Sequence, residues 1–168
     1  MQSRNIVLIG MPGVGKSTVG VLLAKTLKRP FLDTDLVIQT REDRYLQEII
    51  EQDGMEGFLD IEERAICDLR VRGHVIATGG SVVYLPRAMA HLKEAGLLIY
   101  LALPSKELET RVTNITTRGI AMRPGQSLAD LYAERLPLYE QYAHITIDTS
   151  GSTPEEVVTR LSDMLRRA

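Results

Sequence analysis

The sequence has 168 residues, 44% of them hydrophobic, which is enough to bury the core of a single domain spanning 1–168. Its formal net charge is −2 with both signs mixed along the chain, so nucleic acid and anionic membrane surfaces are not expected as partners. Cys67 is the only cysteine, which excludes a disulfide within the chain and favours a reducing compartment such as the cytoplasm.

The first predicted strand, 5–9, is an apolar run that begins too close to the first residue for a signal peptide to be expected. It leads into 10–18, Gly-Met-Pro-Gly-Val-Gly-Lys-Ser-Thr, which matches the P-loop pattern G-x-x-x-x-G-K-[ST]. Helical periodicity over 16–28 completes the order strand, loop, helix that this motif requires. The alternative, a tight glycine turn without a ligand, does not explain this order. The sequence therefore predicts a nucleoside triphosphate site.

The residue types of this loop suit phosphate binding. Its glycines let the backbone approach a polyphosphate, and its N–H groups converge on the anion at the start of a helix. Lys16 supplies a charge for the β- and γ-phosphates, and the hydroxyl of Ser17 is placed to ligate Mg²⁺. The predicted nucleotide-binding residues here are Gly13, Val14, Gly15, Lys16, Ser17 and Thr18.

Two carboxylates follow the second predicted strand, 30–32. Asp33 is a candidate ligand of the Mg²⁺ shell beside Ser17, and Asp35 is a candidate to hydrogen-bond an acceptor hydroxyl and take its proton. Aspartate is also a favoured N-cap, so one of the two is alternatively the cap of the helix predicted over 35–41. Further helices are predicted over 46–53 and 57–72.

The third predicted strand, 74–78, ends in the small-residue turn Thr78-Gly79-Gly80-Ser81, where a ligand can come close to the backbone. A helix is predicted over 86–95, a strand over 97–101 and a helix over 105–113. The apolar run 97–103 is far below membrane-spanning length.

A polar segment, 114–126, separates these elements from the helix predicted over 127–142. It contains Arg118 and Arg123, and suits a lid (about 113–126) that delivers an arginine to the phosphates; an ordinary solvated loop is the alternative. A strand over 144–148 and a helix over 154–167 complete the chain. Alternating strands and helices predict an α/β fold with a parallel sheet covered on both faces, and ligands beyond the carboxyl ends of the strands.

Taken together, these motifs resemble the shikimate kinase family over essentially the whole chain. The matching segments are the P-loop (10–20), the D-x-D segment (31–35), the glycine-rich turn (77–81), the Arg-Pro of the lid (122–124), the R-x-P-L-Y helix (134–139) and the adenine-side loop (148–154). The resemblance implies a P-loop kinase sandwich of three layers with strand order 2-3-1-4-5, and ATP with Mg²⁺ as cofactors.

The resemblance also implies roles for individual residues. Asp35 would contact the acceptor hydroxyl, Arg123 the phosphates and Arg135 the substrate carboxylate. The glycine-rich turn would contribute Gly79 and Gly80 to substrate binding. The nucleotide would also meet Arg118 and, in the adenine-side loop, Thr149. The acceptor-binding segment would cover about 33–63.

Two positions depart from the family pattern. Leu59 stands where the family carries an arginine that binds the substrate carboxylate, and Ser81 replaces the third of three consecutive glycines. Glu62 lies on the same helical face as Leu59, without that arginine beside it. We therefore also consider an acceptor with an ammonium group, such as homoserine, bound through Glu62 or Asp60. For Asp60 the alternative is a surface ion pair with Arg64.

The predicted function is that of an ATP- and Mg²⁺-dependent phosphotransferase acting on a hydroxyl of a small carboxylate-bearing metabolite. Shikimate, converted to shikimate 3-phosphate, and homoserine remain the competing acceptors. A nucleotide-dependent switch is disfavoured because the N-K-x-D segment of GTPases is missing, and a nucleic-acid kinase because no basic stripe is present. We expect a monomer.

Overall fold

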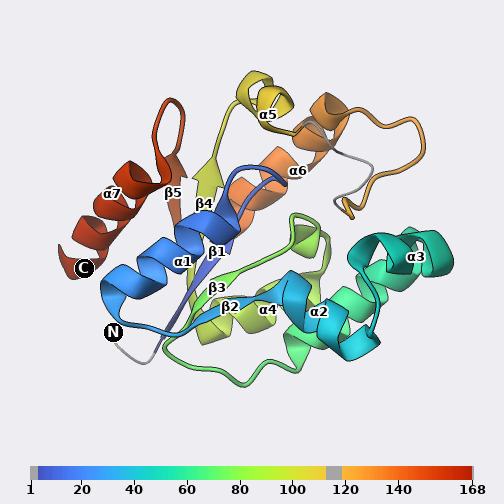
Figure 1. The fold of residues 1–168 in the computed structure, drawn as a ribbon, viewed down its shortest axis with the longest axis horizontal. Helices are drawn as coiled ribbons and strands as arrows, with labels where there is room; N and C mark the ends of the chain where they lie inside the picture. The colour runs from blue at the N-terminus through green and yellow to red at the C-terminus, as the bar shows by residue number, and fades with distance from the viewer. Residues whose placement is uncertain (1–3, 113–118, 168) are drawn as a thin grey trace.

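The computed structural model describes residues 4–112 and 119–167, and its centre is a five-stranded sheet (Figure 1). The sheet order is β2-β3-β1-β4-β5, and every neighbouring pair is parallel. The strands are β1 (Asn5–Ile9), β2 (Phe31–Asp33), β3 (Val75–Ala77), β4 (Gly96–Ala102) and β5 (Ile145–Asp148). The predicted α/β class and the order 2-3-1-4-5 are confirmed.

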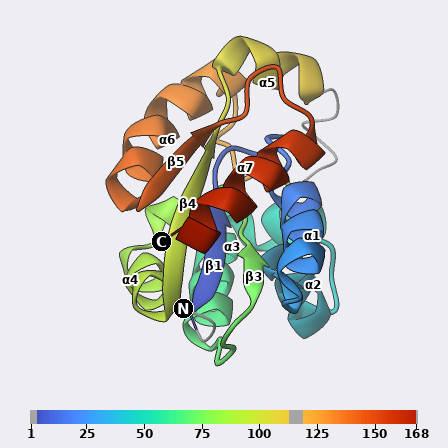
Figure 2. The same ribbon diagram turned by 90° about the vertical axis from the view of Figure 1, so that its left-hand side faces the viewer.

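Helices cover both faces of this sheet. They are α1 (Lys16–Leu27), α2 (Thr34–Glu42), α3 (Leu46–Cys67), α4 (Pro86–Ala95), α5 (Ser105–Arg111), α6 (Leu128–Tyr142) and α7 (Pro154–Arg167), with a 3₁₀ turn η1 (Val82–Tyr84). α1 and α7 pack together on one face, and α4 and α6 lie on the other (Figure 2). Because β1 is fully covered, all five of its residues are buried, which explains its unbroken apolar run. No helix in the described ranges is long and apolar enough to cross a membrane.

The helices predicted over 46–53 and 57–72 form one kinked element, α3. The kink is at Gly54, whose φ of 73° is readily adopted by glycine. The prediction that this helix continues to residue 72 is wrong, because it ends at Cys67. Arg70 donates from Nη1 to the carbonyl oxygen of Cys67, an acceptor that the last turn leaves open, and to that of Leu69 just beyond the helix. The chain is then free to turn into β3.

Two hydrophobic clusters stabilise the molecule. The larger one joins the sheet to the helices on both of its faces. The smaller one lies between α2 and α3 and contains Ile38, Leu46, Ile49, Phe58, Ile61, Ala65 and Ala121. α2 and the first half of α3 project from the sheet as an arm beside the carboxyl ends of β2 and β3, and this cluster is the core of that arm (Figure 1). This arm provides the apolar wall of the candidate site.

Candidate active site

The P-loop has the geometry of a phosphate cradle. Gly10 has a φ of 149°, and a Cβ there would lie 2.8 Å from the carbonyl oxygen of Leu101, so a side chain does not fit. Gly15, with φ of 100°, is the N-cap of α1 and has no side-chain capping bond, which leaves the first N–H groups of the helix available to an anion.

Lys16 places a buried ammonium group inside this cradle. Its Nζ donates to the carbonyl oxygens of Gly10 at 2.7 Å and Met11 at 2.8 Å. Burial lowers the pKa of Lys16 to about 8, and the nearby carboxylate of Asp35 opposes that shift. Negative phosphate oxygens in the cradle would favour the charged form of this lysine.

Ser17 and Asp33 form an oxygen pair at the end of β2. Ser17 Oγ donates to Asp33 Oδ2 at 2.6 Å, and Asp33 Oδ1 accepts from the backbone N–H of Asp35 at 2.9 Å. Of the two aspartates considered as a helix cap, Asp33 therefore caps α2. Hydroxyl and carboxylate oxygens fit Mg²⁺. Within the described ranges no cluster of three or more His, Cys, Asp or Glu side chains could hold a metal, so phosphate and water oxygens would have to complete its shell.

Asp35 lies in the first turn of α2 and faces the P-loop. Burial raises the pKa of its carboxyl group to about 6; the Asp33 carboxylate adds to the shift and the Lys16 ammonium group opposes it. Gly79 packs directly against it, since a Cβ at that position would lie 3.0 Å from Asp35 Oδ1. The carboxylate is thus held beside the glycine-rich turn.

Arg135 on α6 is 1% exposed, and its guanidinium group is fixed by two contacts. Nη2 donates to the carbonyl oxygen of Ala121 at 2.6 Å, and Nε donates to the hydroxyl of Tyr84 at 3.2 Å. Nη1 lies against the turn, 2.9 Å from where a Cβ on Gly80 would be. A buried guanidinium held in one orientation is suited to bind a carboxylate.

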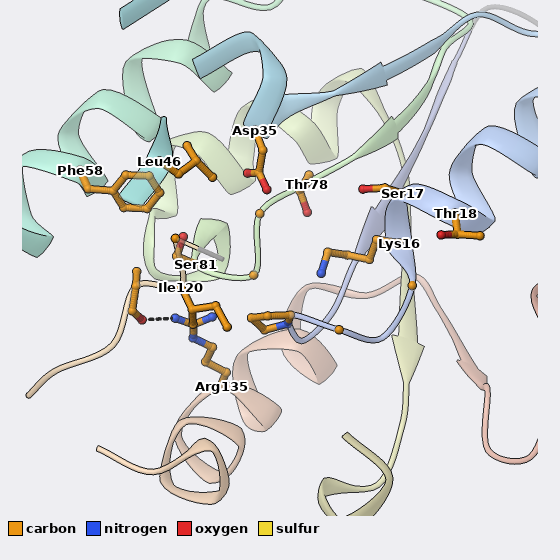
Figure 3. Close-up of a pocket in the computed structure, with 17 residues that line it drawn as sticks. Lys16, Ser17, Thr18, Asp35, Leu46, Phe58, Thr78, Ser81, Ile120 and Arg135 are labelled. Atoms are coloured by element: carbon orange, nitrogen blue, oxygen red, sulfur yellow. Dashed lines mark hydrogen bonds between the residues drawn. The ribbon is translucent and has the colours of Figure 1, made fainter. Parts of the chain in front are cut away.

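These groups surround one cavity of about 280 Å³ between the P-loop and α3 (Figure 3). Lys16, Asp35 and Arg135 enter it from three different helices. Leu46, Phe58 and Ile120 form its apolar side. The remaining lining residues are Pro12, Gly13, Gly15, Ser17, Thr18, Thr78, Gly79, Gly80, Ser81, Gly119 and Ala121.

Several predicted site residues lie outside this lining. Val14 is buried against Gly10, and Thr149 Oγ1 donates to the carbonyl oxygen of Ala102. The side chain of Arg123 is 68% exposed, with Nη1 3.8 Å from Glu134 Oε2. Of the predicted lid, residues 119–121 line the cavity, whereas Arg118 lies outside the described residues.

The structure does not bring Asp60 or Glu62 into contact with the cavity. Asp60 is exposed on the outer face of α3, because Phe58, Ile61 and Glu62 take the inner face. No ion pair joins the Asp60 side chain to Arg64 in the described structure; Arg64 Nε instead donates to the backbone oxygen of Asp60. Glu62 is fully buried, and its Oε2 accepts a 2.7 Å hydrogen bond from Ser81 Oγ. An ammonium group in the cavity therefore meets neither carboxylate.

Sequence reasoning assigned no role to the residues that hold the site in place. Tyr139 donates from its hydroxyl to the carbonyl oxygen of Gly80 at 2.6 Å and stacks on Tyr100 with ring centroids 5.1 Å apart. Its position four residues after Arg135 puts both side chains on one face of α6, a signal that was available. Tyr84, whose ring lies under the guanidinium group of Arg135, could not be linked to Arg135 by any spacing in the sequence.

A P-loop that opens onto a small, partly apolar cavity with a carboxylate and a buried arginine defines a P-loop kinase for a small molecule, a phosphotransferase. The family model described as shikimate kinase matches residues 12–166. The chain belongs to the shikimate kinase family.

Individual relatives agree with this assignment. Shikimate kinase 2 of Enterobacter sp. (strain 638) is 36% identical over 99% of this chain and 98% of its own. The shikimate kinase of Thermodesulfovibrio yellowstonii is 38% identical over 94% and 92%. Among solved structures, the shikimate kinase from Acinetobacter baumannii in complex with shikimate has a TM-score of 0.90 and 31% identity, covering 98% of this chain and 93% of that one.

Proposed function

We propose that this protein transfers the terminal phosphoryl group of ATP to a hydroxyl group of shikimate, giving shikimate 3-phosphate. The observation that carries the proposal is the convergence of Lys16, Asp35 and Arg135 on one cavity beside the P-loop. The structural neighbour from Acinetobacter baumannii, whose fold this chain shares, has shikimate bound.

The donor phosphates would lie in the cradle of backbone N–H groups at 13–18, with Lys16 as the positive charge beside them. Ser17 and Asp33 would hold Mg²⁺. When bound, this ion neutralises charge on the phosphates. Thr149 and Arg118 are proposed to contact the nucleotide. Arg123 is proposed to break its contact with Glu134 and to bind the phosphates instead.

Asp35 would act as the general base. A carboxyl group with a pKa of about 6 is mostly ionised at neutral pH and still basic enough to take the hydroxyl proton. As this proton moves to Asp35, the acceptor oxygen forms its bond to the terminal phosphorus and the bond to the departing ADP breaks. Arg135 would hold the carboxylate of shikimate. Gly79 and Gly80 would pack against the shikimate ring, and Phe58 would contact the apolar side of that ring.

Homoserine was considered because of Leu59 and Glu62. In the structure Leu59 packs half-buried against both hydrophobic clusters, and neither Glu62 nor Asp60 offers an oxygen to the cavity. A hydroxy acid without an amine is therefore favoured. We further propose that the enzyme is a cytoplasmic monomer, with its single cysteine typical of a reducing compartment.

The test is ADP release with MgATP in the presence and absence of shikimate. Asp35→Asn should keep the size of the side chain and lower kcat by about 10²-fold or more, since general base catalysis contributes roughly 10²–10⁴-fold. Glu56→Gln, at an exposed position of α3, is the matched control and should behave as the unaltered chain. ADP release that shikimate does not increase would overturn the proposal.

A further inference from the structure

One buried carboxylate oxygen beside the cavity has no hydrogen-bond partner among the described residues. It is Glu62 Oε1, on a side chain that is fully buried, and only Oε2 is bonded, by the hydroxyl of Ser81. A buried, ionised carboxylate with one neutral donor is costly, because burial removes the water that would stabilise its charge.

The groups that face Glu62 do not supply an ion pair. Asp35 approaches from α2: a Cβ on Gly79 would lie 2.8 Å from Glu62 Oε1 and 3.0 Å from Asp35 Oδ1, so two carboxyl groups flank one glycine. The two nearby cations act only through space, and the described structure shows neither bonded to Glu62. Arg135 donates to Ala121 and Tyr84, and Lys16 donates to carbonyl oxygens of the P-loop.

We propose that Glu62 is a positioning residue that works as an uncharged carboxylic acid. Its Oε2 holds Ser81 and thereby the glycine-rich turn, and the proton on its other oxygen keeps a second negative charge away from the acceptor. The acceptor carboxylate then meets Arg135, its hydroxyl meets Asp35, and Asp35 is the one ionised carboxyl group of this pair beside the acceptor. The part of this proposal that concerns the acceptor rests on the proposed function. The part that concerns the charge of Glu62 does not.

The electrostatics support this geometry. Burial raises the pKa of Glu62 from 4.5 to about 7; the hydrogen bond from Ser81 opposes the shift, Asp35 adds to it, and Arg135 and Lys16 oppose it. A raised pKa in the folded chain means that folding is favoured most below the ordinary value of 4.5, and that this stabilisation is lost as the pH rises through about 7.

Glu62→Gln tests the charge directly, because glutamine has nearly the same shape, can still accept from Ser81 and stays neutral at every pH. The Tm of this variant minus the Tm of the unaltered chain should increase by about 3 °C or more from pH 5.5 to pH 8.5. Glu56→Gln removes an exposed carboxylate from the same helix and should show no such shift. A Tm difference that does not change with pH, or that turns against Glu62→Gln at pH 8.5, would overturn the proposal.

Ser81→Ala provides a second test if Glu62→Gln does not fold. It removes the one hydrogen-bond donor that the described residues supply to Glu62. Its Tm should therefore fall more at pH 8.5, where the carboxylate needs that donor most, than at pH 5.5. An equal loss at the two pH values would contradict an uncharged Glu62.

The acceptor kinetics test the consequence for substrate binding. Between pH 6.5 and pH 8.5 the KM for shikimate should rise at least threefold in the unaltered chain, as Glu62 becomes charged, and stay nearly constant in Glu62→Gln. Parallel KM profiles in the two proteins would overturn the role of Glu62 toward the acceptor. If the unaltered chain shows no shikimate-dependent ADP release at any pH, the proposed function fails, while the Tm comparison still decides the charge of Glu62.

Discussion

Tyr139 and Gly80 are joined by a hydrogen bond of 2.6 Å from the phenol hydroxyl to the carbonyl oxygen. Arg135, one helical turn earlier on α6, packs its Nη1 against the same glycine. One face of α6 therefore holds the glycine-rich turn and also provides the buried guanidinium group. The position of the turn relative to Arg135 is set by α6.

Tyr139→Phe removes this tether and keeps the ring that stacks on Tyr100. We expect a loss of about 1 kcal/mol in the free energy of unfolding, the usual net value of one hydrogen bond. The KM for shikimate should rise several-fold with little change in kcat, because the turn is proposed to bind the acceptor and to carry no reacting group. Chemical denaturation and steady-state kinetics check the two effects. An unchanged KM in the folded variant would show that the turn does not need the tether.

Gly79→Ala and Gly80→Ala should damage different kinetic constants. A Cβ at 79 would press on Asp35 and Glu62, whereas one at 80 would lie 2.8 Å from Pro12 Cδ and 2.9 Å from Arg135 Nη1. We expect the first variant to lose kcat, by about 10²-fold for a displaced catalytic group, and the second to raise the KM for shikimate. Identical losses in the two variants would argue against separate roles for Asp35 and Arg135.

Asp33→Asn separates metal binding from helix capping. Asparagine caps helices as well as aspartate does, so α2 should still begin at Thr34. With one charged ligand removed, the Mg²⁺ concentration that gives half-maximal activity should rise about tenfold or more, and chelation of the metal should abolish activity in both proteins. A Mg²⁺ titration checks this. An unchanged midpoint would remove Asp33 from the metal shell.

Leu59→Arg should restore a cation three residues before Glu62 on α3. A charge-assisted contact contributes about 1.5–3 kcal/mol, so we expect the KM for shikimate to fall about tenfold if the guanidinium reaches the acceptor. The same cation should keep Glu62 ionised and remove the loss of stability that otherwise occurs as the pH rises through about 7. Leu59→Met is the size-matched control. A folded Leu59→Arg protein with unchanged KM would show that this position lies out of reach of the acceptor.

The sheet and the P-loop were predictable from the sequence because each depends on local patterns. Continuous apolar runs mark strands buried on both faces, and the glycine spacing before Lys16 has one well-known structural setting. The end of α3 was not predictable in this way, since the apolar pattern continues past Cys67 and a contact from Arg70 helps to end the helix.

The acceptor side of the site was predicted less well, because it depends on contacts between distant segments. The inward positions Phe58, Ile61 and Glu62 could have excluded Asp60 from the site by helical periodicity alone. The hydrogen bond between Ser81 and Glu62 could not have been foreseen, since it joins a turn after β3 to a helix nineteen residues earlier. Both departures from the family pattern thus lie next to Glu62: Leu59 on its helix and Ser81 at its carboxylate.

The most direct test of the proposed function compares initial rates of ADP release with MgATP and either shikimate or homoserine as acceptor. Asp35 and Arg135 line the cavity, whereas Asp60 and Glu62 do not. This arrangement predicts strong release with shikimate and only background release with homoserine. Release that depends on homoserine and ignores shikimate would contradict it, and would mean that the cavity binds a different class of acceptor.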